Sequence, residues 1–277
     1  MKTLLVPTDF SVTAENALKY AIAFARQVAA RKLIIYHAYQ APASPGDPMM
    51  PSIELLGLDE IKKAGDTALE QLLNAHRDSF IGFEVATINE YNSLTEGINN
   101  VCQREQVDLV IMGITAVSEV EETLFGSNAV NVAKNITIPV LIIPQNVSFV
   151  TIDDAVFACD YKQVAKTTPV QPITRFLKAT GAQLSVLHID AEYEHLTIEQ
   201  EHQRLMLDYI LEIPNVNYVH LKHENFVEGI NAFVTSNKTE VVITIPKKLG
   251  WFEGLFAKKH SKELAFHSKV PVLMVHD

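Results

Sequence analysis

An internal repeat constrains this chain more than any other feature of its sequence. Four short landmarks recur, the first two 151 positions later and the last two 132 positions later. The matched pairs are 7–10 with 158–161, His37 with His188, 96–99 with 228–231, and 139–141 with 271–273. Chance seldom keeps two constant offsets over four landmarks, so the sequence predicts a tandem duplication.

The two copies differ in length where the offset changes. Copy one carries 19 additional residues around 41–60, a stretch in which four prolines and Gly46 predict an irregular loop. This loop follows the second strand, and we expect residues 41–51 to form a mobile flap over a ligand site. A chain of 277 residues is about twice a usual domain, so we expect two domains, 1–146 and 152–277.

Each copy alternates β-rich runs with helical patterns. In copy one, strands are expected near 2–7, 32–38, 83–88, 107–112 and 138–143, and helices near 12–30, 58–78, 94–105 and 127–135. The last two strands are nearly continuous apolar runs, as in sheets covered by helices on both faces. This alternation predicts a doubly wound, five-stranded parallel α/β sheet in each copy.

Local features also recur in the two copies. Ser93 and Glu96 have the spacing of a capping box, in which Ser93 accepts the N–H of Glu96 and Glu96 reaches back. Asn225 and Glu228 keep that chemistry in copy two. The histidine that recurs late in the second strand is interpreted as structural, and Cys102 as a packing residue.

Composition excludes several classes of function. The chain has 23 basic and 33 acidic residues, a formal net charge of −10, which disfavours general binding to nucleic acid. Cys102 and Cys159 are too few and too far apart for a disulfide framework, and His220 and His223 lack an evident third metal ligand. No apolar run reaches the roughly 18–20 residues of a membrane span, and no signal-peptide cleavage site follows the N-terminus. We therefore expect a cytoplasmic protein without a metal site or a membrane partner.

Two strand ends in copy one form the candidate ligand site. Ligands of open parallel sheets bind beyond the carboxyl ends of the strands, and here Asp9 and Gly113 follow the first and fourth strands. Gly126-Ser127 opens the next helix, where backbone N–H groups either bind an anion or are satisfied by a cap. Asp9 likewise either caps the first helix or accepts hydrogen bonds from a ribose or an adenine amino group. Motifs of Walker NTPases, dinucleotide enzymes and serine hydrolases are absent, so no catalytic residue is predicted.

These residues resemble the universal stress protein family over nearly the whole chain. The resemblance rests on Pro7-Thr8-Asp9, on the spacing Gly113-x2-Ala116-x9-Gly126-Ser127, and on the terminal strand that contains 139–141. It implies the adenine nucleotide alpha hydrolase-like fold and an ATP site. The implied nucleotide-binding residues are Pro7, Thr8, Asp9, Ala38, Met112, Gly113, Thr115, Ala116, Gly126, Ser127 and Asn128.

Three departures from the family pattern weaken the site in copy one. Ala116 replaces the middle glycine, and Ala129 stands where a hydroxyl residue often supports the phosphates. The intervening loop carries Glu119, Glu121 and Glu122 without a basic residue, and these would repel a triphosphate unless they face solvent or Mg²⁺ intervenes.

Copy two has departed further from the family pattern. It has Pro246-Lys247-Lys248 after its fourth strand and 257–261 in place of Gly126-Ser127, so the glycines are lost although Asp160 remains. We therefore expect no ATP binding of the family type in copy two. An apolar cluster around Trp251 is interpreted as local packing, or else as a lid or partner patch.

The resemblance implies a tandem universal stress protein with a regulatory or protective role, not a dedicated catalyst. Copy one is expected to bind ATP with Mg²⁺, or another adenine nucleotide. The last strands, 138–143 and 270–275, are expected to pair about an internal pseudo-two-fold axis, while a homodimer and the protein partner stay open. The alternative is an interaction module in which both sites have degenerated. An adenylating enzyme of this general fold ranks last, because its motifs are absent.

Overall fold

A computed structural model describes residues 1–40, 52–115, 127–192, 195–245 and 270–276. The strands are β1 Thr3–Pro7, β2 Lys32–Tyr39, β3 Glu84–Tyr91, β4 Leu109–Ile114, β5 Val140–Pro144, β6 Asp154–Ala158, β7 Gln183–Asp190, β8 Asn217–Lys222, β9 Val241–Thr244 and β10 Val272–Met274. The helices are α1 Val12–Gln27, α2 Ser52–Ala75, α3 Leu94–Glu105, α4 Ser127–Asn135, α5 Val164–Thr167, α6 Val170–Thr180, α7 Ile198–Leu211 and α8 Phe226–Asn237, with a 3-10 turn at Arg77–Ser79.

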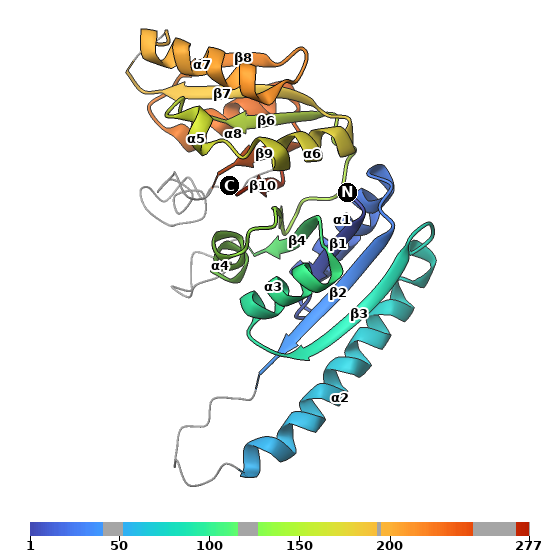
Figure 1. The fold of residues 1–277 in the computed structure, drawn as a ribbon. Coiled ribbons are helices and arrows are strands. Elements are labelled where there is room, and N and C mark those ends of the chain that lie inside the picture. Colours follow the sequence, from blue (N-terminus) through green and yellow to red (C-terminus); the bar gives the residue numbers. More distant parts are fainter. Residues whose placement is uncertain (41–51, 116–126, 193–194, 246–269, 277) are drawn as a thin grey trace.

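The strands form one ten-stranded sheet in the order β3-β2-β1-β4-β5-β10-β9-β6-β7-β8. Strands β1–β5 are parallel to one another, and so are β6–β10. The strand order of the second half mirrors that of the first, which places β3 and β8 at the two edges of the sheet (Figure 1). This arrangement confirms the predicted α/β fold class.

The two halves meet where β5 pairs with β10, the only antiparallel pairing among the described strands. Leu141 lies opposite Leu273, and these residues are equivalent in the repeat. A pair of equivalent residues facing each other is what a two-fold axis through that point requires. The predicted pairing of the last strands is therefore confirmed, and it removes both strands from the sheet edge.

Side chains alternate between the two faces of the sheet, as expected for strands with period two. On β1, Leu4 and Val6 belong to a core that also contains residues of α1, α2, α6 and α7 and runs through both halves. Leu5 points to the opposite face and packs with α3 and α4. Helix α8 covers that opposite face in the second half, where Ile230 and Val242 belong to a third cluster.

Contacts between α1 and α6 add to the junction of the halves. The rings of Phe24 and Phe176 stack with centroids 6.1 Å apart, and both side chains are fully buried. The amide of Gln27 donates to the carbonyls of Ile152 and Thr180 at 2.9 and 3.0 Å, and its oxygen accepts the Ile152 N–H at 3.1 Å. Helix α1 is thus hydrogen-bonded both to the connection after β5 and to the end of α6.

Most predicted elements agree with the structure, with one larger difference in α2. Helices α3 and α4 begin and end at the predicted residues. Helix α2 begins at Ser52, six residues earlier than predicted, and ends at Ala75. The prolines that predicted an irregular loop end at position 51, and proline is tolerated immediately before a first helical turn. The predicted loop therefore extended too far along the chain, because residues 52–57 belong to α2.

The capping box predicted at α3 is wrong in its hydrogen bonds. Ser93 has the extended backbone of an N-cap, but its side chain makes no capping bond. A partly exposed hydroxyl can hydrogen-bond to water instead at little cost. In copy two, Asn225 Oδ1 does accept the Glu228 N–H at 3.2 Å. Only this half of the predicted chemistry is present among the described residues.

Candidate functional site

The candidate site in copy one lies where the strand order reverses. Strand β1 pairs with β2 on one side and with β4 on the other, so the connections leave the sheet in opposite directions at its carboxyl ends. Such reversal points are where open α/β sheets bind ligands. The N–H of Thr8 donates to the Tyr36 carbonyl at 2.8 Å and holds the end of β1 against β2.

Three hydrogen bonds from backbone N–H groups to side-chain oxygens stabilise the turn between β1 and α1. The Thr8 hydroxyl accepts the Phe10 N–H, and Asp9 Oδ1 accepts the Ser11 N–H, each at 3.0 Å. Ser11 is the N-cap of α1, because its hydroxyl accepts the Ala14 N–H at 3.2 Å. Of the two alternatives given for Asp9, the cap of the first helix is thus not formed. Its exposed carboxylate stabilises the turn through Oδ1, and the described residues provide no hydrogen bond to Oδ2.

Gly113 is required by packing inside the protein. A Cβ at this position would lie 2.5 Å from the carbonyl oxygen of Thr13 and 2.8 Å from Thr13 Cγ2. The lack of a side chain therefore allows the first turn of α1 to approach the end of β4. The hydroxyls of Thr13 and Thr115 are 3.0 Å apart and hydrogen-bonded, so Thr115 is also engaged with α1.

The other predicted site residues divide by exposure. Pro7 is buried in the sheet and Met112 is 6% exposed, so their side chains belong largely to the core. Ala38 is half-buried and Asn128 is exposed. Ser127 is the first residue of α4. Ala129 is 2% exposed and packs in the core, so it faces the sheet instead of the site.

Several predicted features lie outside the described residues. In copy one these are the flap at 41–51, Ala116, Glu119, Glu121, Glu122 and Gly126. In copy two they are the lysines and the apolar cluster around Trp251 within 246–269. The structure therefore shows only the β1, β2 and β4 side of the predicted nucleotide site, together with the backbone at the start of α4.

A polar network that the sequence did not reveal adjoins the site. The rings of Phe10 and His37 lie 4.8 Å apart, and Phe10 has a left-handed backbone with φ of 63°. His37 Nδ1 and Asn89 Oδ1 are hydrogen-bonded at 2.9 Å, and Asn89 Nδ2 donates to Asp66 Oδ1 on α2 at 2.8 Å. A hydrogen bond from Lys62, together with that from Asn89, lowers the pKa of Asp66. Only the register of β2 against β3, which pairs His37 with Asn89, could have identified this network.

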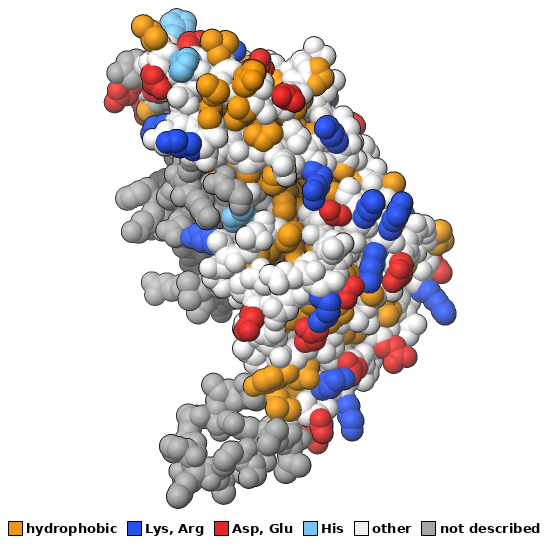
Figure 2. All heavy atoms as spheres, viewed as in Figure 1, with side chains coloured by type: hydrophobic (Ala, Val, Ile, Leu, Met, Phe, Trp, Pro, Cys, Tyr) orange, Lys and Arg blue, Asp and Glu red, His pale blue; other side chains and the backbone are white. Residues whose placement is uncertain are grey.

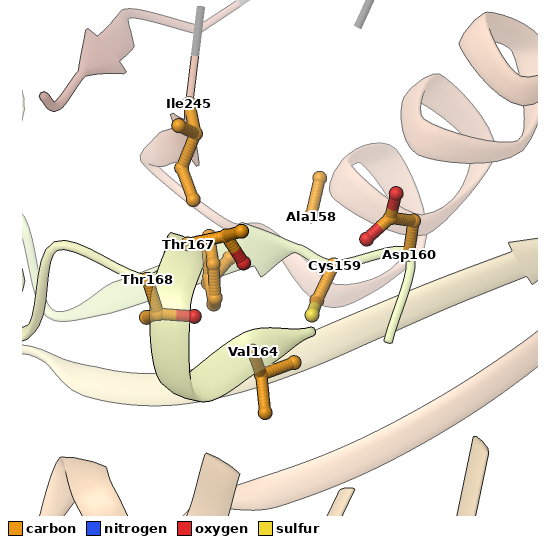
Figure 3. Close-up of a pocket in the computed structure, with 8 residues that line it drawn as sticks. Ala158, Cys159, Asp160, Val164, Thr167, Thr168 and Ile245 are labelled. Atoms are coloured by element: carbon orange, nitrogen blue, oxygen red, sulfur yellow. The ribbon is translucent and has the colours of Figure 1, made fainter. Parts of the chain in front are cut away.

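Copy two has a hollow at the equivalent reversal point, between β6 and β9 (Figure 3). Its volume is about 290 Å³, including space open to solvent. The lining residues are Phe157, Ala158, Cys159, Asp160, Val164, Thr167, Thr168 and Ile245. Asp160 Oδ1 accepts the Lys162 N–H at 3.0 Å, the same contact that Asp9 makes in copy one. The turn after the first strand is thus preserved in both copies.

Ile245 distinguishes the hollow of copy two from the site of copy one. It occupies the position equivalent to Gly113 in the repeat, and it points toward the hollow. The first helix of copy two is interrupted, with α5 ending at Thr167 and α6 beginning at Val170. The break falls at Thr168 and Pro169, and proline interrupts an α-helix because it lacks the backbone N–H and crowds the preceding turn.

His188 is the buried counterpart of His37. It is 4% exposed, its Nδ1 donates to the Cys159 carbonyl at 2.8 Å, and Gln200 Nε2 lies 3.1 Å from its Nε2. Burial lowers the pKa of His188, and the hydrogen bond to Cys159 opposes this shift. The ring of Tyr161 packs against it at 5.0 Å, as Phe10 packs against His37. The recurring histidine therefore has a structural role in copy two, as predicted.

Among the described residues, no group of three or more His, Cys, Asp or Glu side chains is arranged to hold a metal ion. None of the described helices is both long and apolar enough to cross a bilayer. Cys102 and Cys159 are both buried and neither forms a disulfide, and burial raises the pKa of the Cys102 thiol to about 12. Cys102 is a packing residue, as predicted.

Comparisons with known proteins agree with this architecture. The universal stress protein family model matches residues 1–144. A universal stress protein of Methanocaldococcus jannaschii is 31% identical over 153 residues, which cover 51% of this chain and 94% of that protein. The crystal structure of a universal stress protein from Archaeoglobus fulgidus covers 99% of this chain and 98% of its own, with a TM-score of 0.70 at 18% identity. A universal stress protein in complex with cAMP matches 51% of this chain and 96% of its own, with a TM-score of 0.37 at 21% identity.

Proposed function

The chain belongs to the universal stress protein family, and on that premise we propose that it is a regulatory protein whose first copy binds an adenine nucleotide. We propose further that residues 1–146 and 152–277 are its two domains, that it acts in the cytoplasm, and that it has no dedicated catalytic role. ATP is the expected ligand, because the residues at the ends of β1 and β4 resemble those of nucleotide-binding family members.

The observation that carries the proposal is the carboxylate of Asp9 at the reversal point of the sheet. The turn after β1 holds it by a single oxygen, Oδ1, and the residue is exposed. An oriented, solvent-facing carboxylate at the carboxyl end of the sheet has the chemistry to accept hydrogen bonds from ribose hydroxyls or an adenine amino group. Mg²⁺ bound with ATP usually keeps several waters and needs only one or two protein carboxylates, so no protein cage is required.

The difference between the copies supports assigning the nucleotide to copy one alone. Both copies keep the aspartate and its turn. In copy two, however, Ile245 stands at the position of Gly113 and lines the hollow. Its side chain occupies space at the strand ends that a glycine leaves empty.

Asp9→Ala and Asp160→Ala form a matched pair for the test. Each removes a carboxylate that accepts the N–H two residues along the chain at 3.0 Å, so their effects on the local turn should be alike. Titration calorimetry with ATP, AMP and cyclic AMP, each with Mg²⁺, should show binding to the parent protein. Loss of a hydrogen bond to a charged group should weaken binding about tenfold or more in Asp9→Ala only. Equal affinity in Asp9→Ala and the parent would refute the assignment to copy one.

The alternative proposal is a ligand-free interaction module, and one observation favours it. The two features at the end of β4 that the family uses for phosphates, Gly113 and Thr115, are both engaged by Thr13 within the protein. If this alternative holds, none of the three nucleotides will release heat on titration, and Mg²⁺-ATP will not raise the melting temperature. A ligand specific for the folded state must raise it, so the two measurements together separate the proposals.

A further inference from the structure

Helix α7 presents an apolar stripe to solvent. Ile198, Leu205 and Tyr209 are 92%, 56% and 76% exposed. Together with exposed His202 they follow a spacing of four, three and four residues, so they lie along one face of the helix. Figure 2 shows hydrophobic side chains and histidine gathered at the end of the molecule where Figure 1 places α7 and β8.

The protein's own fold uses a different face of α7. Leu207 and Leu211 are buried in the main core, and Met206 and Ile210 pack against it. The helix therefore has one apolar face toward the sheet and a second one toward solvent. A surface helix needs only the first, with polar residues on the opposite side.

The duplication provides an internal control, because α2 occupies the same place in the topology of copy one. From Gly57 to Ala75, every exposed residue of α2 is polar, charged or alanine. The part of α2 whose side chains are described thus has the polar outer face expected of a helix that contacts only solvent on that side. The stripe on α7 departs from it at three large apolar positions, and exposed apolar surface of this kind marks interaction sites.

The charges beside the stripe identify the kind of partner. Glu199, Glu201 and Asp208 border it, and Arg204 is the only basic residue of α7. Arg204 is paired with Glu201 at 2.8 Å. Two α7 helices packed against each other would bring these acidic borders together in either orientation, which disfavours a second copy of the chain. A helix with basic borders would complement them.

We propose that this face of α7 binds an amphipathic helix of another protein, one whose apolar stripe is flanked by lysine or arginine. From Ile198 to Tyr209 the stripe is about 16 Å long, which is enough for about three turns of a partner helix. Two helices that pack against each other along apolar seams present residues at this spacing on both partners. The proposal concerns a surface on copy two and does not depend on nucleotide binding in copy one.

The probe is a synthetic peptide of about three heptads with leucine at the two seam positions and lysine at the flanking positions. Lysine repulsion should keep it unfolded alone, so circular dichroism reports helix formation when it binds. Two matched peptides are the controls, one with glutamate at the flanking positions and one with glutamine at the seam. Saturable binding is expected from the lysine–leucine peptide only, measured by fluorescence anisotropy at physiological salt.

The variant Leu205→Gln with Tyr209→Gln tests the surface on the protein side. Both residues are well exposed, so the fold should be unaffected, and binding should weaken at least about tenfold, because two apolar anchors are lost. Gln71→Ala with Asn74→Ala changes two exposed residues of α2 and should leave affinity unchanged. Equal binding by both double variants, or no binding of the lysine–leucine peptide at all, would overturn the proposal.

Two further outcomes would replace the proposed partner by another. Sedimentation velocity of the protein alone would reveal a dimer that the α7 variant abolishes, which would assign the stripe to a second copy. Co-sedimentation with phosphatidylcholine–phosphatidylglycerol vesicles, lost in the same variant, would assign it to a membrane surface. The proposal requires that the parent protein show neither behaviour, as the acidic borders of α7 predict.

Discussion

Replacing Gly113 by alanine should destabilise the protein, although the same replacement at Gly57 should stabilise it. Both changes add one methyl group and restrict the unfolded chain equally. They differ only in what the new Cβ meets in the folded protein. At Gly57, on α2, no heavy atom lies within 4 Å of the added carbon. At Gly113 the carbonyl oxygen of Thr13 lies 2.5 Å away.

The size of the destabilisation at Gly113 depends on the atom that the new Cβ would meet, the carbonyl oxygen of Thr13. The oxygen belongs to the backbone of α1, so the overlap is relieved only if the helix moves away from β4. Overpacking of this kind costs typically about 1–3 kcal/mol. At Gly57, removal of glycine from a helix gains about 0.5–1 kcal/mol. For a chain of this size about 2–4 °C in Tm corresponds to each kcal/mol.

The assay is thermal and urea unfolding of the parent and the two variants, followed by circular dichroism. We expect the Tm to fall by about 2–12 °C in Gly113→Ala and to rise by about 1–4 °C in Gly57→Ala. Because both variants make the same chemical change, Tm shifts of opposite sign would isolate the contact between Gly113 and α1. A Gly113→Ala variant as stable as the parent would show that α1 does not need the close approach.

Three further predictions test the core and the titration of a buried histidine. Burial lowers the pKa of His188, so the unfolded chain protonates this residue at a higher pH than the folded chain does. The unfolding free energy measured in urea should therefore decline as pH falls below about 6.5, and His188→Gln should flatten that decline. Phe24→Ala removes a fully buried ring that stacks on Phe176, so unfolding free energy should fall by about 3–5 kcal/mol; a loss under 1 kcal/mol in urea titration would contradict this junction. Cys102 and Cys159 are buried, so a thiol reagent at pH 8 should modify neither rapidly in the folded protein and both in urea; fast native labelling of Cys102 would contradict its raised pKa of about 12.

Much of the fold was predictable because its signals are local. The bounds of α3 and α4 were predicted correctly from residue patterns within each segment. The pairing of β5 with β10, expected from the family resemblance, brings the repeat-equivalent Leu141 and Leu273 opposite each other. The start of α2 was missed because its proline-rich neighbour dominated the local composition.

The reversal point of the sheet was predictable, but the hydrogen bonds of the residues there were not. Asp9 was recognised at the end of β1, while the choice of Ser11 as N-cap depends on which hydroxyl reaches the Ala14 N–H. Several residues in a row can cap a helix, and their sequence alone does not rank them. The network of His37 with Asn89 was missed because it depends on strand register.

By itself, the sequence determined the α/β class of this chain and predicted its repeat, because recurring landmarks and alternating hydrophobic patterns can be read from the residues in order. Tertiary structure alone decided that Gly113 makes room for Thr13, a hundred positions away in the chain. It also decided which face of α7 meets solvent, since a helix with two apolar faces leaves that choice to the sheet it packs against. Both decisions depend on contacts between distant segments, and no local pattern encodes them.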